Sequence, residues 1–386
     1  MQIESGGRKM YKIMTAGPTQ VRENVRQARA LATTNPDLDE AFYDFYRETC
    51  EMIEKLLHAS GTAYILGGEG ILGLEAASAS LTEPGDRVLV VDNGIFGKGF
   101  ADFVKMYGGE PVLYTSDYYN PVNVDELAAF LEKDSDFKYA TVVHCDTPSG
   151  VLNDIAKICP LLKEHGILTV VDSVAGMFGE YVNVDESCID ILCGGSQKAL
   201  SAPAGLTMVW VSADAQAAME NRKTPIAAFY ANLLNFKDYY EKKEFPYTMP
   251  ISDITGLRAA VENVVADETI LERHAKIAEA TRHAVRAAGL ALYLESGYSN
   301  TVTVLCVPEG LTDTQILSGM RDKYGVMISG CFDVLAGKVI RIGHMGENAN
   351  TADMELTFDA MDKTFADLGY PLKCSLKEAF KEALEK

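Results

Sequence analysis

Basic charge, cysteine pairs and long apolar runs are scarce in this sequence, and each shortage excludes a class of function. The chain carries 35 Lys and Arg against 55 Asp and Glu, a net charge of −20. Such an excess of negative charge repels phosphate backbones and anionic lipids, so we expect no nucleic-acid partner and no membrane partner. A small anion remains compatible with a local positive site.

The eight cysteines and six histidines lack the spacing of metal or disulfide sites. No Cys-x-x-Cys pair occurs, and segments such as "TVVHCD" and "TVLCV" place cysteines inside apolar runs. We therefore expect buried reduced thiols, a cytoplasmic protein and no metal site. The first residues, "MQIESGGRKMYK", contain no apolar stretch, which predicts no signal peptide, and no apolar run reaches membrane-spanning length.

Short β-rich runs alternate with helical stretches between about residues 60 and 212. The runs "RVLVVD", "ILTVVDS" and "LTMVWVS" are typical of buried strands, whereas "GILGLEAASASL" and "IAKICPLLKEHG" have helical spacing. Continuous apolar strands separated by helices predict an α/β fold with a mainly parallel sheet covered on both faces. Ligands of such sheets bind at the carboxyl ends of the strands.

The length of 386 residues favours two domains. A long helical segment from about Thr255 to Ala288 precedes strand, helix, strand and helix patterns that indicate a smaller α+β domain. We predict an N-terminal segment over residues 1–20, a large domain over 21–255 and a small C-terminal domain over 256–386.

Three predicted strand ends carry groups that are suited to binding or catalysis. Glycines in "GGEGILGLEAA" separate a strand from a helix, which suits either a phosphate cradle or a plain tight turn. Asp172 ends the strand "ILTVVD" and is either a cap or a partner for a cationic ring nitrogen. Lys198 follows the next strand, so both side chains belong to one rim of the sheet. A phosphate cradle, a carboxylate and a lysine are the groups that pyridoxal phosphate requires.

The segments "VDSVAGMFG" and "DILCGGSQKALSAPAG" resemble the cofactor segment of the class V aminotransferases, in their alanine–glyoxylate and serine–glyoxylate branch. The resemblance extends in order through "TAGPTQV", "DNGIFGKGF", "HCDTPSGVL", "YTMPIS" and "GKVIRIGHMGENAN". It implies a fold type I transferase with a seven-stranded sheet, and pyridoxal phosphate as the cofactor.

The resemblance also implies roles for single residues. Lys198 would be the Schiff-base lysine, and Asp172 would pair with the pyridine nitrogen. The remaining cofactor contacts would come from the backbone at Glu69, Gly70 and Ile71, and from Phe96, Thr147, Gln197 and, across a homodimer interface, Thr248. Gly17 and Arg341 would bind the substrate, the arginine by a two-pronged contact with its carboxylate.

Three positions depart from the family pattern. Glu69 stands where Ser is common, Phe96 where Trp is frequent, and Phe245 where a phosphate-binding Tyr is usual. A carboxylate near a phosphate is costly unless it points away, so only the backbone of Glu69 is expected to bind. His144 lies in an apolar strand and is expected to be a buried, hydrogen-bonded histidine.

The predicted activity is transfer of an amino group from a small amino acid, alanine or serine, to glyoxylate or pyruvate in two half-reactions. 2-Aminoethylphosphonate and ureidoglycine remain alternative donors. A lyase such as a cysteine desulfurase also remains open, with Cys331 in "SGCFD" as its candidate thiol.

Overall fold

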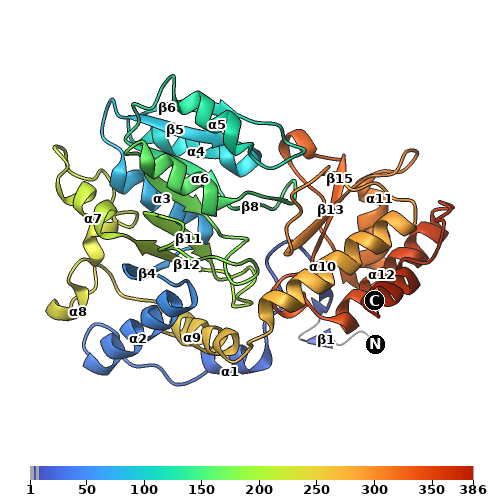
Figure 1. The fold of residues 1–386 in the computed structure, drawn as a ribbon. Helices are drawn as coiled ribbons and strands as arrows, with labels where there is room; N and C mark the ends of the chain where they lie inside the picture. The colour runs from blue at the N-terminus through green and yellow to red at the C-terminus, as the bar shows by residue number, and fades with distance from the viewer. Residues whose placement is uncertain (1–3, 6–7, 386) are drawn as a thin grey trace.

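The central sheet of the computed structural model contains seven strands, and β12 runs antiparallel to the others (Figure 1). The structure describes residues 4–5 and 8–385, so part of the predicted segment 1–20 lies outside it. The strands lie side by side in the order β4 (Thr62–Gly67), β12 (Leu206–Val211), β11 (Ile191–Gly195), β10 (Leu168–Asp172), β7 (Tyr139–Val143), β5 (Arg87–Asp92) and β6 (Glu110–Thr115). The mainly parallel sheet predicted from the apolar runs is therefore confirmed.

Helices cover this sheet and complete the larger body of the molecule (Figure 1). They are α1 (Glu23–Arg29), α2 (Glu40–Leu56), α3 (Gly70–Leu81), α4 (Ile95–Met106), α5 (Val124–Leu131), α6 (Ile155–Glu164), α7 (Ala213–Glu220), α8 (Tyr239–Lys242) and α9 (Ile251–Val265), with the 3-10 turn η1 (Leu233–Phe236). Short strands outside the sheet form the pairs β1 (Glu4–Ser5) with β2 (Arg8–Lys9) and β8 (Cys145–Asp146) with β9 (Val151–Leu152).

Helix α3 packs closely against the sheet because its sequence is rich in small residues. A Cβ at Gly73 would lie 2.5 Å from the Thr207 hydroxyl of β12, so a larger residue would push the helix away. Glu69 caps the start of α3 with its own carboxylate. The close packing brings that helix start to the carboxyl ends of the parallel strands.

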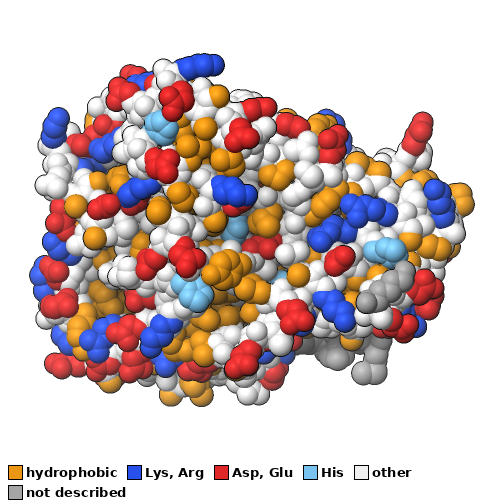
Figure 2. All heavy atoms as spheres, in the orientation of Figure 1, with side chains coloured by type: hydrophobic (Ala, Val, Ile, Leu, Met, Phe, Trp, Pro, Cys, Tyr) orange, Lys and Arg blue, Asp and Glu red, His pale blue; other side chains and the backbone are white. Residues whose placement is uncertain are grey.

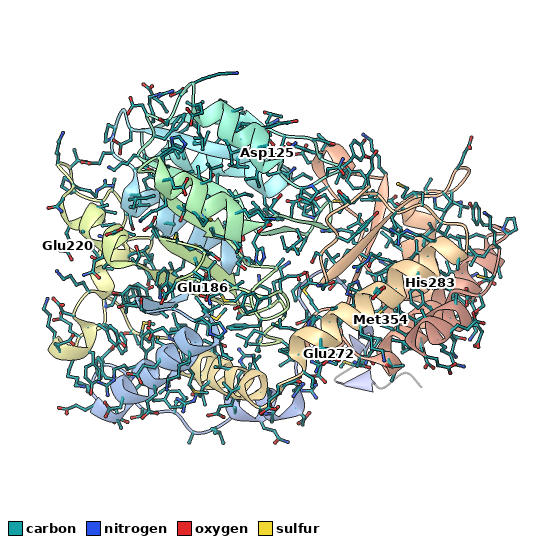
Figure 3. The ribbon with its side chains drawn as sticks, in the orientation of Figure 1. Asp125, Glu186, Glu220, Glu272, His283 and Met354 are labelled. Atoms are coloured by element: carbon teal, nitrogen blue, oxygen red, sulfur yellow. The ribbon has the colours of Figure 1, made fainter. Side chains whose placement is uncertain are left out.

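A second apolar core forms a smaller body near the C-terminus, drawn in orange and red in Figure 1. Its elements are α10 (Ile270–Ala287), β13 (Val302–Cys306), α11 (Asp313–Ser318), the π-helical turn η2 (Gly319–Lys323), β14 (Val326–Met327), the turns η3 (Asp333–Leu335) and η4 (Gly346–Asn348), β15 (Val339–Gly343), α12 (Thr351–Asp367) and α13 (Leu376–Leu384). Met354 of α12 belongs to this core, whereas His283 of α10 is exposed (Figure 3). The N-terminal strand β3 (Lys12–Ile13) pairs with β14.

The single helix expected between Thr255 and Ala288 is wrong. The structure has two helices, α9 and α10, because Asp267 organises a turn between them. Its carboxylate accepts hydrogen bonds from the backbone and hydroxyl of Thr269 and pairs with Arg273. Helix α9 packs against α1 and α2 of the larger body, whereas α10 packs against α13 of the smaller one. The two halves of the expected helix therefore belong to different bodies. The domain boundary placed after residue 255 stays a prediction.

The sequence reasoning also missed β6, whose residues are only partly buried at the edge of the sheet. The expectation of buried thiols is wrong for Cys188 and Cys374, which are exposed because each lies in a surface loop rather than in an apolar run.

Within residues 4–5 and 8–385, no helix combines the length and apolar character needed to span a membrane. Acidic and basic side chains are interspersed over the face drawn in Figure 2.

Candidate active site

Lys198 lies in the turn after β11, and the N-terminal segment holds its amine. Its Nζ donates a hydrogen bond of 2.6 Å to the backbone carbonyl of Ala16. A Cβ on Gly17 would lie 2.5 Å from that Nζ, and the φ of 92° at this position also favours glycine. Gly17 therefore allows the backbone to approach the lysine closely.

The electrostatic surroundings of Lys198 favour its neutral form. Burial, and then the positive charge of Arg341, lower the pKa of the amine from 10.5 to about 8. Thr19 fixes the turn itself, since its hydroxyl donates to the Lys198 carbonyl over 3.0 Å. The lysine is thus a positioned amine that can gain and lose a proton near neutral pH.

Asp172 ends strand β10 beside Cys193 of β11, which places it on the same rim of the sheet as Lys198. Its side chain is 4% exposed, and Oδ1 accepts a hydrogen bond of 2.9 Å from the Val174 backbone N–H. Burial, reinforced by the charge of Asp146, raises the pKa of the carboxyl from 3.8 to about 7. A cationic hydrogen-bond donor at this place would stabilise the ionised carboxylate.

The start of α3 and the Lys198 turn form a polar end of the site, which we call the phosphate end: Glu69, Gly70, Ile71 and Gln197. Glu69 Oε1 accepts a hydrogen bond of 3.2 Å from the Ile71 backbone N–H. Glu69 Oε2 accepts one of 3.0 Å from Gln197 Nε2. The Glu69 carboxylate does not point away from this end, because it caps the helix and pairs with the amide.

Phe96 is held over the site by a carboxylate that the sequence reasoning did not single out. The backbone N–H of Phe96 donates to Asp146 Oδ1 over 3.2 Å, and the Ser149 hydroxyl donates to Asp146 Oδ2 over 2.7 Å. Asp146 is 1% exposed, and it directly follows the apolar run "YATVVHC", a strand-end position that could have identified it. Thr147 comes next in the chain.

Arg341 in β15 is buried without a carboxylate partner among the residues that the structure describes. Its side chain is 9% exposed, Nε donates to the Gly330 carbonyl over 2.7 Å, and Nη1 donates to the Thr147 carbonyl over 3.4 Å. The guanidinium also lies over the Phe332 ring, 5.8 Å from its centroid. A buried guanidinium in this state is a ready partner for a ligand carboxylate.

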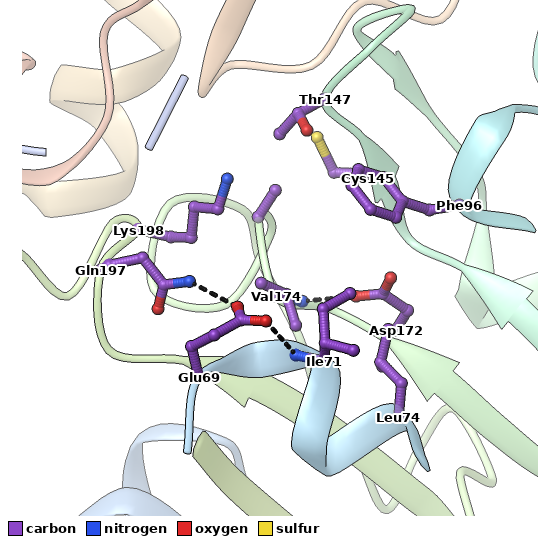
Figure 4. Close-up of a pocket in the computed structure, with 11 residues that line it drawn as sticks. Glu69, Ile71, Leu74, Phe96, Cys145, Thr147, Asp172, Val174, Gln197 and Lys198 are labelled. Carbon is purple, nitrogen blue, oxygen red and sulfur yellow. Dashed lines mark hydrogen bonds between the residues drawn. The ribbon is translucent and has the colours of Figure 1, made fainter. Parts of the chain in front are cut away.

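Lys198, Asp172 and Phe96, with the phosphate end, face a cavity of about 270 Å³, whereas Arg341 is not among its lining residues (Figure 4). Figure 4 shows Lys198 and Asp172 on opposite sides of it, with Glu69 and Gln197 together at one end. The cavity is lined by Glu69, Ile71, Leu74, Phe96, Cys145, Thr147, Asp172, Val174, Ala175, Gln197 and Lys198. Of these, the sequence reasoning missed Leu74, Cys145, Val174 and Ala175, the last two of which come just after Asp172 and Ser173 in "VDSVAG".

The family model described as aminotransferase class V matches residues 15–341. The chain belongs to the class V aminotransferases. A pyridoxamine–pyruvate transaminase of Mesorhizobium japonicum is 33% identical over 87% of this chain and 86% of its own. A serine–glyoxylate aminotransferase of Arabidopsis thaliana is 31% identical over 94% and 92%. The crystal structure of a ureidoglycine–glyoxylate aminotransferase from Bacillus subtilis matches all of both chains with a TM-score of 0.94 and 26% identity.

Pyridoxal phosphate is the cofactor of class V aminotransferases, and the ring end of this site, Lys198, Asp172, Phe96 and Thr147, fits it. An amine and a buried carboxylate face one cavity, and an aromatic ring lines it. The phosphate end fits less well, because the Ile71 N–H and the Gln197 amide already donate to Glu69. Within residues 4–5 and 8–385, no cluster of three or more His, Cys, Asp or Glu has the arrangement of a metal site.

Six candidate site residues named from the sequence do not line this cavity: Gly17, Gly70, Arg341, Thr248, Phe245 and Cys331. Thr248 is exposed and donates to Asp37 Oδ2 over 2.9 Å, so its contact across a dimer stays a prediction. Phe245 is buried and stacks on Tyr43 with ring centroids 4.6 Å apart. Cys331 is partly buried, and burial raises the pKa of its thiol.

Proposed function

We propose that this class V aminotransferase moves an amino group from a small amino acid to a 2-oxo acid through Lys198, Asp172 and Arg341. The observation that carries the proposal is the buried Arg341, which has no carboxylate partner among the described residues and whose charge acts on the Lys198 amine. The guanidinium suits the carboxylate of an α-amino acid, and the lysine amine suits proton transfer at its α-carbon.

Each residue has a separate task in this proposal. When bound, the pyridine ring supplies an electron sink for the carbon that loses its proton. Lys198 carries that proton, because its lowered pKa leaves a neutral amine available near pH 8. Asp172 keeps the ring nitrogen protonated, and Arg341 orients the substrate carboxylate.

Phe96 covers the ring, and its place is fixed by Asp146. Thr147 would contact the ring hydroxyl, and Gly17 would admit the substrate against the backbone. The backbone of Glu69, Gly70 and Ile71, with Gln197, would face the 5′ substituent of the ring.

The relatives support glyoxylate and pyruvate as acceptors, since their names pair these 2-oxo acids with serine, ureidoglycine or pyridoxamine as donors. We propose alanine or serine as the donor because Arg341 suits an α-carboxylate.

The lyase alternative has little support, because a thiol whose pKa is raised by burial, as in Cys331, is a poor nucleophile. A homodimer in the cytoplasm, with Thr248 reaching the partner's phosphate end, is part of the proposal.

Half-reaction spectra test the proposal directly. Purified protein is loaded with pyridoxal phosphate or with pyridoxal and mixed in turn with alanine, serine, ureidoglycine and 2-aminoethylphosphonate. A donor converts the cofactor to its amine form, and glyoxylate or pyruvate then reverses the change. Lys198→Ala should lower turnover by roughly 10⁴-fold, since a positioned base contributes up to that much. Full activity of that variant, or no spectral change with any donor, would refute the proposed function.

A further inference from the structure

The carboxylate of Glu69 occupies the place where this site would hold a phosphate. One of its oxygens takes the Ile71 N–H at the start of α3, and the other takes the Gln197 amide. A helix start with free N–H groups attracts anions, and here the chain supplies the anion itself (Figure 4). A phosphate group would need the same donors and would have to displace the carboxylate.

The Gln197 side chain is oriented by this arrangement. Its Nε2 points to Glu69, which leaves Oε1 buried and without a hydrogen-bond partner. Turning the amide over would place Oε1 against the Glu69 carboxylate, where two acceptors repel. Oε1 instead lies against Gly195, where a Cβ would be 3.0 Å away. The pair therefore presents acceptor oxygens where a phosphate site needs donors.

The charges that line the cavity also oppose a phosphate. Glu69 and Asp172 are acidic, and Lys198 is the single Lys or Arg among the lining residues. A phosphate monoester carries about −1.5 to −2 charges near pH 7. Placed beside Glu69, it would meet a like charge with no second cation lining the cavity to compensate it. The positive charge of Arg341 acts on the Lys198 amine, and we assign it to the substrate carboxylate rather than to the phosphate end.

We propose that Glu69 is the residue that sets ligand specificity at this end, and that it selects pyridine rings with a neutral 5′-hydroxymethyl group over the corresponding phosphate esters. A hydroxymethyl group can donate its proton to the Glu69 carboxylate and leaves the Ile71 and Gln197 contacts in place. The phosphate ester requires Glu69 to turn away and to give up both of its hydrogen bonds. The inference rests on the proposed function, because it assumes that the ring binds between Lys198 and Asp172.

Binding of two amines that differ only in the phosphate tests this specificity. Pyridoxamine and pyridoxamine 5′-phosphate lack the aldehyde, so neither bonds covalently to Lys198, and calorimetry on ligand-stripped protein gives each Kd. We expect the wild-type protein to bind pyridoxamine more tightly. Glu69→Ser and Glu69→Gln should shift the ratio of the two Kd values toward the phosphate ester by about tenfold or more, because a like-charge contact disappears.

Glu75→Gln provides a matched control. It removes one carboxylate from the same helix, where Glu75 accepts a hydrogen bond from the Tyr107 hydroxyl away from the cavity. Its ratio of Kd values should equal that of the wild type. Tighter wild-type binding of the phosphate ester, or a shift of less than twofold in both Glu69 variants, would overturn the specificity while leaving the proposed function intact. Failure of the folded protein to bind either ring would overturn both.

Discussion

The ring end and the phosphate end of this cavity differ in what they leave for a ligand. At the ring end, the buried Asp172 carboxylate has a raised pKa, and Lys198 has a lowered one. At the phosphate end, the helix start and the Gln197 amide are already paired with Glu69. The ring end therefore keeps hydrogen-bonding capacity beyond its contacts with Ala16 and Val174, whereas the phosphate end uses its donors within the chain.

Membership of the family therefore predicts the contacts to the ring but not those to its 5′ substituent. Burial of Asp172 without a neighbouring cation raises the pKa of its carboxyl. A cationic ring nitrogen beside it would lower that pKa again. The cap uses one of the free N–H groups at the helix start, so a second anion has to compete with Glu69 for the Ile71 N–H. Substitutions at the ring end should thus affect phosphorylated and unphosphorylated rings equally, unlike substitutions of Glu69.

Asp172→Asn should give the largest effect at the ring end. The amide keeps the shape but cannot hold the ring nitrogen in its cationic form, so we expect kcat/KM to fall by roughly 10²–10³-fold, as for loss of one preorganised electrostatic contact. The ratio of the pyridoxamine and pyridoxamine 5′-phosphate Kd values should stay as in the wild type. A changed ratio would show that the two ends are not independent.

The same substitution should alter the pH dependence of stability in the ligand-free protein. Burial raises the pKa of Asp172 from 3.8 to about 7, so its stabilising contribution is complete below pH 4 and is lost as pH rises through 7. Asparagine does not titrate. The Tm of Asp172→Asn relative to wild type should therefore be higher at pH 8 than at pH 5. An equal difference at both pH values would contradict the raised pKa.

Arg341→Lys should give an intermediate effect, confined to the substrate carboxylate. Lysine keeps the charge but loses the planar fork, so KM for the amino acid should rise by about tenfold, the value of one hydrogen bond to a charged group. The corresponding amine without a carboxylate provides the control substrate, and its rate should not change. A similar loss for both substrates would mean that Arg341 supports the fold rather than the substrate.

Much of the larger body was predictable because its strands are continuous apolar runs. The runs ending at Asp172 and preceding Lys198 fix which side chains reach the carboxyl rim of the sheet, and the structure places both on one cavity. The edge strand β6 was not predictable in the same way, since it is only half buried and carries a weak apolar signal. The break between α9 and α10 depends on side-chain bonds of Asp267, which periodicity does not register.

The contacts within the site were less predictable than its position. Glu69 was recognised as a departure, but the direction of its carboxylate depends on Gln197, 128 positions away in the chain. Asp146 acts on Phe96 across 50 positions. Such pairings arise from the packing of α3 and α4 on the sheet, so local sequence does not contain them.

Phe96→Leu should give the smallest effect and the sharpest test of independence between the two ends. The Phe96 backbone N–H bonds to Asp146 whatever the side chain, so the helix start should keep its place. Loss of the aromatic face should weaken binding of pyridoxamine and of its phosphate ester alike, by about 2- to 10-fold, the range of an aromatic contact. Phe96→Tyr keeps the face and should bind both rings as the wild type does. Weaker binding of only one ring in Phe96→Leu would mean that Phe96 senses the 5′ group, and that Glu69 is not the sole determinant of the specificity.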